Sequence, residues 1–86
     1  MVKLEKTLKA VANRRRLAIL EFLKTEKEAP VGDIASKIKL SFRSTSKHLA
    51  ILSSLDILEK TQKSSQVFYC LSADQHPVVK YLLSTL

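Results

Sequence analysis

The sequence predicts a mainly α domain with one small β-hairpin (α+β), in the order α-α-α-α-β-β-α. Over most of the chain, apolar residues recur at spacings of three and four, as on the buried face of a helix. After residue 57 this period changes, because Leu58, Lys60 and Gln62 alternate with Glu59, Thr61 and Lys63, and the run 67–71 is β-branched and aromatic, as strands prefer. Only one Gly and two Pro interrupt the chain, so we expect short connections.

The first two helices are predicted over residues 3–12 and 14–25. In the first, we expect one apolar stripe formed by Leu4, Leu8, Val11 and Ala12. Asn13 suits the N-cap of the second helix because its side chain can accept a hydrogen bond from a free backbone N–H. Residues 26–30 are predicted to be a polar connection, since Pro30 stops a helix from continuing on its N-terminal side.

A third, short helix over residues 31–39 is followed by a tight turn and a fourth helix over residues 42–54, which Ser41 caps. Two short helices joined by a tight turn form a helix-turn-helix unit. The spacing in the fourth helix predicts a buried face made of Phe42, Thr45, Leu49 and Leu52.

A β-hairpin is predicted over residues 58–71 because two strand-like runs flank the polar segment Lys63-Ser64-Ser65-Gln66. This segment lacks Gly, so we expect a longer and looser tip than a two-residue turn. A last helix is predicted over residues 77–86, with Pro77 in its first turn. A helix-turn-helix followed by a hairpin is a winged helix, and we expect residues 1–86 to form one such domain.

The charge of the chain indicates an anionic partner. There are 15 basic and 8 acidic residues, a net charge of +7, and residues 37–63 hold six cations against two acids. This balance favours nucleic acid. No apolar run is long enough for a membrane span, the N-terminus does not resemble a signal peptide, and one Cys allows no internal disulfide. We therefore expect a cytoplasmic protein without a membrane partner.

The fourth helix and the hairpin supply the candidate DNA contacts. On the helix these residues lie largely off the predicted buried face and can donate hydrogen bonds, as a reader of the major groove must. On the hairpin they flank the tip, where they can hold phosphates or keep an exposed edge soluble. The candidates are Ser41, Arg43, Ser44, Ser46, Lys47, His48, Lys60, Lys63 and Gln66.

Two further features allow more than one interpretation. Three cations, Arg14–Arg16, at a helix start are unfavourable with the helix dipole, which indicates either phosphate contact or pairing with an acid such as Asp56 or Glu59. Cys70 lies in a strand-like run, so a buried small hydrophobe is the default expectation and a redox role the alternative.

Several segments resemble the ArsR/SmtB-like (arsenical-resistance-repressor type) winged helix-turn-helix transcriptional regulators. They are Leu8-Lys9-Ala10-Val11-Ala12-Asn13-Arg14-Arg15-Arg16-Leu17-Ala18-Ile19-Leu20, Leu40-Ser41 with Ser46-Lys47-His48-Leu49 and Leu52, and Val67-Phe68-Tyr69. The resemblance implies a repressor that forms a homodimer through the terminal helices, residues 3–12 and 77–86. It also implies a recognition helix in the major groove, a wing near the backbone or minor groove, and a structural pairing role for Arg16.

The chain departs from the metal-sensing members of that family. The segment 30–35 has no Cys, and Asp74-Gln75-His76 matches only the first half of the other metal motif. We therefore expect no metal and no cofactor, and a small-molecule or metal effector is not evident.

Among functions, a sequence-specific regulator of double-stranded DNA is the leading prediction. A winged-helix protein–protein interaction module, or a subunit of a larger transcription complex, is the alternative, because one fold serves many functions. An enzyme is not expected. The sequence has no plausible Ser/His/Asp or Cys/His set, no Gly-rich phosphate loop and no paired-carboxylate cleft.

Overall fold

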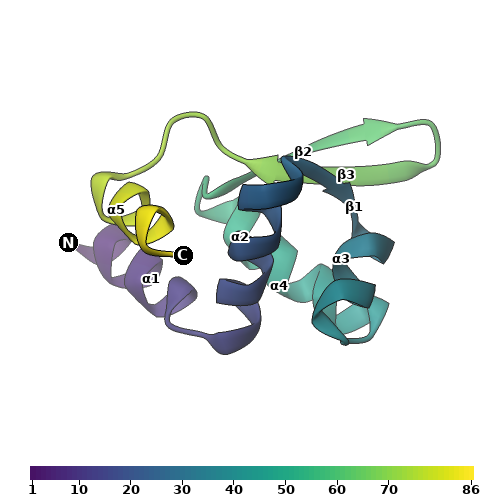
Figure 1. The fold of residues 1–86 in the computed structure, drawn as a ribbon. Helices are drawn as coiled ribbons and strands as arrows, with labels where there is room; N and C mark the ends of the chain where they lie inside the picture. Colours follow the sequence, from purple (N-terminus) through teal and green to yellow (C-terminus); the bar gives the residue numbers. More distant parts are fainter.

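The computed structural model describes residues 1–86 and confirms the winged helix-turn-helix order (Figure 1). Its helices and strands are α1 (Val2–Val11), α2 (Arg14–Glu26), β1 (Glu28–Pro30), α3 (Val31–Ile38), α4 (Phe42–Ser54), β2 (Leu58–Lys63), β3 (Gln66–Leu71) and α5 (Pro77–Thr85). The hairpin of β2 and β3 projects beyond the helices as the wing, while α1 and α5 lie at the opposite end of the molecule (Figure 1).

Three polar side chains fix where helices begin. The Asn13 side chain accepts a hydrogen bond from the Arg16 backbone N–H, and the Ser41 hydroxyl accepts one from the Ser44 N–H. His76 accepts from the Val78 N–H, with Pro77 at the start of α5. Each bond satisfies a backbone donor that the helix leaves free. The caps predicted at Asn13 and Ser41 are confirmed.

The segment predicted to be a polar connection contains a strand, so that prediction is wrong. Residues Glu28–Pro30 form β1, which pairs antiparallel with β3 in a three-stranded sheet of order β1-β3-β2. The strand is only three residues long, too short to show a hydrophobic period. Pro30 lacks an N–H, which an edge strand tolerates.

The tip of the wing is tighter than predicted. Lys63 pairs with Gln66, so only Ser64 and Ser65 connect the two strands. Ser64 has φ of 56°, whereas Ser65 is not in the positive-φ region. A positive φ at the first central residue is the mark of a type II′ turn, which normally carries Gly there. The twist of the paired strands therefore imposes the tight turn in spite of its sequence.

The back of α4 forms the centre of the core. Thr45, Leu49 and Leu52 are each 0% exposed and pack with residues from α2, α3 and the sheet. Phe42, predicted to be the first member of this buried face, is instead 62% exposed. It is the first residue of α4, one turn before the first buried side chain, and the helix start projects past the core. The prediction for Phe42 is wrong for this reason.

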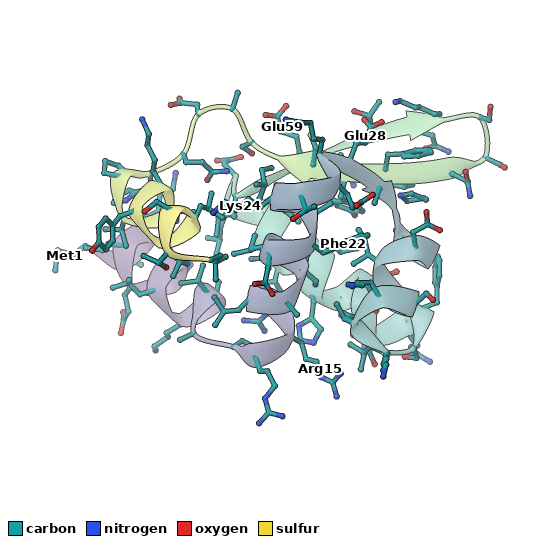
Figure 2. All side chains as sticks on the ribbon, in the orientation of Figure 1. Met1, Arg15, Phe22, Lys24, Glu28 and Glu59 are labelled. Carbon is teal, nitrogen blue, oxygen red and sulfur yellow. The ribbon has the colours of Figure 1, made fainter.

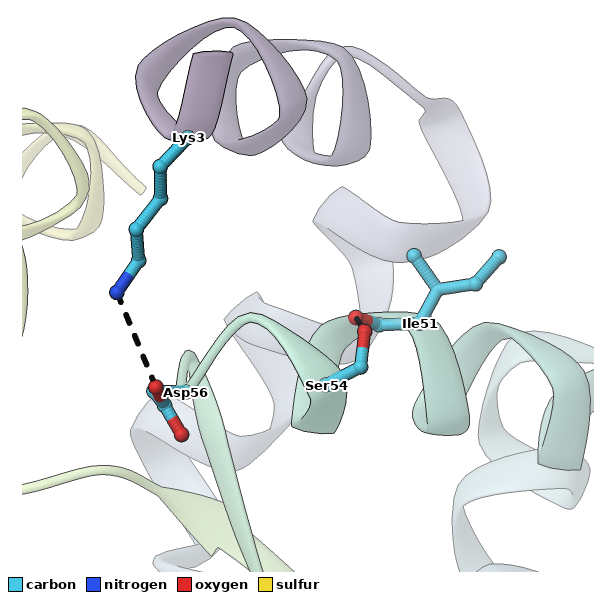
Figure 3. A network of polar contacts seen from close by, with 4 residues as sticks. All are labelled: Lys3, Ile51, Ser54 and Asp56. Carbon is cyan, nitrogen blue, oxygen red and sulfur yellow. Dashed lines mark hydrogen bonds and ion pairs between the residues drawn. The ribbon is translucent and has the colours of Figure 1, made fainter. Parts of the chain in front are cut away.

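The outward face of α1 also differs from prediction. Thr7, Ala10 and Val11 are buried, whereas Leu8 and Ala12 are exposed. The helix is thus rotated so that part of its apolar stripe faces away from the core. On its other side, Lys3 lies 3.9 Å from the Asp56 carboxylate in the turn after α4 (Figure 3), where Asp56 has φ of 61°. Both partners are exposed, so this ion pair contributes little to stability.

The last helix is fixed by its C-terminal end and by one buried side chain. The Lys24 ammonium on α2 donates hydrogen bonds to the carbonyls of Leu83 and Leu86, at 2.7 and 2.9 Å. A cation there satisfies free carbonyls and suits the helix dipole. Val79 is 1% exposed and belongs to the core. None of the helices has the length and apolar character that crossing a membrane requires.

We predict that Thr45→Val stabilises the protein. The Thr45 hydroxyl is fully buried and has no hydrogen-bond partner, and such a group costs about 1–3 kcal/mol. Valine keeps the shape and removes the unpaired oxygen. Urea denaturation at fixed protein concentration should show the gain, while Thr25→Val on the exposed side of α2 should change the free energy of unfolding by less than about 0.5 kcal/mol. A loss of stability at position 45 would mean that the hydroxyl does find a partner.

Candidate nucleic-acid interface

The start of α4 presents hydrogen-bond donors away from the core. Arg43 and Lys47 are exposed on the side opposite Thr45 and Leu49, and Ser44 and Ser46 are half-buried beside them. The three ion pairs of the chain involve other cations. The charges of Arg43 and Lys47 are therefore free to meet an anion.

Ser41 has a dual capacity at this helix start. Its Oγ accepts a hydrogen bond from the Ser44 N–H at 3.1 Å, which uses one lone pair. A hydroxyl also carries one proton that it can donate. Capping the helix and donating to a phosphate are therefore compatible roles for the same side chain.

His48 is held from one side by α2. The Arg16 Nε–H donates to His48 Nδ1 at 3.1 Å, so Nδ1 is an acceptor and the proton of the neutral imidazole lies on Nε2. Burial lowers the pKa of His48 below 6.5, and the positive charges of Arg16 and Arg15 lower it further. His48 is thus a neutral donor through Nε2, suited to a phosphate oxygen.

The arginines at the start of α2 do not pair with acids, contrary to one of the two expectations for them. Arg16 Nη1 donates to the Ala10 carbonyl and Arg15 Nη1 to the Ile38 carbonyl, each at 3.0 Å. These carbonyls lie in the last turns of α1 and α3, where helix dipoles favour cations. The cost of cations at one helix start is thus offset at two helix ends.

The predicted acid partners are too far away or already occupied. Arg15 lies at the end of α2 farthest from the sheet, whereas Glu59 lies at the sheet (Figure 2). Glu59 accepts a hydrogen bond from the Ala73 N–H, and Asp56 pairs with Lys3. Arg14 is exposed, so phosphate contact stays a prediction for it.

Two of the three wing candidates border a hollow between the wing and α4. Lys60 lies opposite Tyr69, which is buried, so its side chain is on the core-facing side of the hairpin. Together with Gln66 it borders the hollow, which measures about 420 Å³. The hollow is lined by Pro30, Val31, Gly32, Phe42, Ser46, Lys60, Ser65, Gln66, Val67 and Tyr69.

Lys63 lies on the other face of the hairpin. Its ammonium is 2.6 Å from a Glu28 carboxylate oxygen and 5.0 Å from the centre of the Phe68 ring. This places Lys63 against β1 and apart from the hollow. Of the two wing lysines, Lys63 is therefore the one whose charge is already partly neutralised.

The Cys70 thiol is half-buried in β3. Burial raises its pKa, and the negative charges of Glu59 and Glu28 raise it further against the opposing effect of Lys63. A raised pKa keeps the thiol protonated, and a protonated thiol is a weak nucleophile. Cys70 is thus half-buried rather than buried as expected, and its thiol has low reactivity.

Phe42 is the residue of this surface that the sequence did not identify. It borders the same hollow as Ser46 and Lys60, although its spacing placed it in the core. Its position immediately after the capping Ser41 was the available signal, because a first helical residue lies beyond the region that the next turn packs against.

Comparison with known proteins gives the same fold and one family. Residues 13–60 match the model of the family described as bacterial regulatory protein, arsR family. The chain is 38% identical to the transcriptional activator HlyU of Vibrio cholerae over 79 residues, 92% of this chain and 72% of HlyU. It is 36% identical to the nodulation protein NolR of Rhizobium meliloti over 67 residues, 78% of this chain and 54% of NolR.

Solved structures of two related proteins have the same fold as this chain. Reduced HlyU from Vibrio cholerae superposes with a TM-score of 0.82 at 36% identity, covering 99% of this chain and 85% of that one. The homodimeric winged helix-turn-helix DNA-binding domain Mb0332 from Mycobacterium bovis gives 0.80 at 26% identity, covering 96% of this chain and 73% of that one.

We predict that His48 makes stability depend on pH near neutrality. Its pKa is lower in the folded chain than the ordinary 6.5, so between these two values the unfolded chain binds more protons. Stability is then complete above about pH 6.5 and falls as the pH drops through the folded pKa. Denaturation at pH 7.5 and 5.5, above the range where most carboxylates titrate, should show a smaller loss for His48→Gln than for the wild type. Equal losses would contradict this assignment.

Proposed function

Because the chain belongs to the arsR family of bacterial regulatory proteins, and is a transcriptional regulator with a winged-helix DNA-binding domain rather than an enzyme, we propose that it binds double-stranded DNA sequence-specifically as a homodimer. The observation that carries this proposal is the exposed, unpaired cationic start of α4, with Arg43 and Lys47 beside a wing that carries Lys60.

In this proposal α4 enters the major groove and the wing lies on the backbone or in the minor groove. Arg43 reads a base edge, since a guanidinium pairs bidentately with guanine, and Ser44 and Lys47 assist it. Phosphates are held by Ser41, Ser46, His48, Lys60 and Gln66. Lys63 contributes a smaller part, because it would have to leave Glu28 to neutralise a phosphate fully.

The terminal helices are proposed to join two copies of the chain. Exposed apolar side chains gather there, with Met1 97%, Val2 68% and Leu8 45% exposed on or before α1, and Tyr81 75% exposed on α5. An 86-residue chain buries a limited core, so a second copy would add the missing burial. Mb0332, similar in fold over nearly all of this chain, is homodimeric.

Repression is the proposed mode of regulation. A dimer that occupies two half-sites about one helical turn apart covers the promoter DNA beneath it. The relative HlyU is named an activator. A reporter assay therefore decides between repression and activation. Expression of a reporter gene placed downstream of the selected site should fall when the protein is produced. A rise in reporter expression would show that the protein is an activator.

The test of the proposed function is selection of bound duplexes from a random pool, followed by a salt titration. We expect a two-fold symmetric site, together with an affinity that falls steeply with salt because phosphate neutralisation releases counterions. A protein that enriches no sequence, or whose duplex binding ignores salt, would be better explained as a protein–protein interaction module.

We predict that Arg43→Ala weakens binding to the selected site by about 1–3 kcal/mol and relaxes base preference at one position of each half-site. The matched control is Lys60→Ala, which also removes one cation but from the wing. It should weaken selected and random duplexes alike and lower the salt slope by about one. Uniform weakening by Arg43→Ala would show that Arg43 touches only the backbone.

We predict that Tyr81→Glu shifts the dimer toward monomer. Burying a large apolar side chain contributes about 1.5–3 kcal/mol, so its replacement by a charge should raise the dimer dissociation constant at least about tenfold. Sedimentation equilibrium measures this directly. Phe42→Ala removes the other highly exposed ring, at the opposite end of the molecule, and should leave the dimer intact. If Tyr81→Glu also stays dimeric, α5 is not in the interface.

A further inference from the structure

Phe42 is an apolar side chain in the middle of a cationic surface. It is the first residue of α4 and 62% exposed. Arg43 follows it directly, and Ser46 and Lys60 share its hollow. A single exposed ring on a protein surface is ordinary. This ring, however, lies at the start of α4, the helix that is proposed to read the DNA bases.

The hollow beside Phe42 restricts what can occupy it. None of its lining residues is acidic, and its polar groups include Lys60, Ser46 and Gln66. The apolar part is formed by Phe42 with Pro30, Val31, Val67 and Tyr69. The hollow therefore suits an anionic occupant that offers an apolar group close to hydrogen-bonding groups.

Duplex DNA meets this requirement in its major groove. There the edge of thymine carries a C5-methyl group beside the O4 acceptor, whereas the minor groove has no such group. The N-terminal residues of a recognition helix are those that contact base edges. Phe42 is the first residue of α4, so it would lie at the depth of the bases when Arg43 does.

We propose that Phe42 is a specificity-determining residue that reads thymine by packing its ring against the C5-methyl group in the major groove. This rests on the proposed function and goes further, because it assigns one base to one side chain. Phe42 would recognise a thymine by its methyl group, while Arg43 recognises a neighbouring base by hydrogen bonds. The half-site would thus contain a thymine adjoining the base that Arg43 reads.

The proposal is tested by exchanging the methyl group alone. Each thymine of the pool-selected duplex is replaced, one at a time, by deoxyuridine, which lacks only that methyl. We expect the wild-type protein to bind about fourfold more weakly at one thymine of each half-site, the equivalent of about 0.8 kcal/mol for one buried methyl group. Phe42→Ala should bind thymine and uracil duplexes equally at that position.

Two control variants make the result specific. Phe42→Leu keeps an apolar side chain at the helix start and should retain a preference for thymine over uracil. Ile51→Ala removes an exposed apolar side chain of the same helix, but near its other end, where Ile51 points away from the α4–β2 turn (Figure 3). It should show the full wild-type sensitivity to uracil.

The outcomes separate this inference from the function beneath it. If Arg43→Ala relaxes specificity but no uracil replacement affects the wild type, the thymine contact is wrong and the DNA-binding function stands. The thymine contact is equally wrong if Phe42→Ala keeps the wild-type sensitivity to uracil. If the wild type selects no duplex at all, both proposals fail together.

Discussion

The guanidinium of Arg16 joins the three helices whose relative positions decide what α4 exposes. It donates to the Ala10 carbonyl of α1 and to His48 Nδ1 of α4, while its own backbone N–H is held by Asn13 at the start of α2. With Thr45, Leu49 and Leu52 fully buried behind α4, the helix can neither rotate nor slide without breaking these contacts. The outward direction of Arg43 and Lys47 follows from that restraint.

The same restraint separates two surfaces by charge and polarity. Cations at the start of α4 and on the inner face of the wing remain free, whereas Lys3, Lys9 and Lys63 are paired with acids elsewhere. Exposed apolar side chains gather on α1 and α5, and these two helices lie at the other end of the molecule (Figure 1). These are the two ends to which the proposed function assigns the DNA and the second copy of the chain.

Features with strong local causes could be predicted from the sequence. Asn13 and Ser41 cap helices because their side chains accept hydrogen bonds from the backbone N–H three residues on. Leu49 and Leu52, which the spacing placed on the buried face of α4, are buried. Features set by distant contacts were missed. Strand β1 exists because β3 pairs with it, and Ser64 adopts a positive φ because the paired strands require a tight turn. Phe42 has the spacing of a buried residue, but it is exposed because the start of α4 projects past the core.

The proposed function depends on whether two segments form one continuous DNA-binding surface. These are the start of α4 and the core-facing side of the wing. Backbone amide NMR shifts, followed while a selected duplex is titrated in, test it most directly. We expect the largest changes on residues 42–48 and 60–66, with little change over residues 19–26 of α2. Changes concentrated on α2, or on only one of the two predicted segments, would contradict a continuous surface.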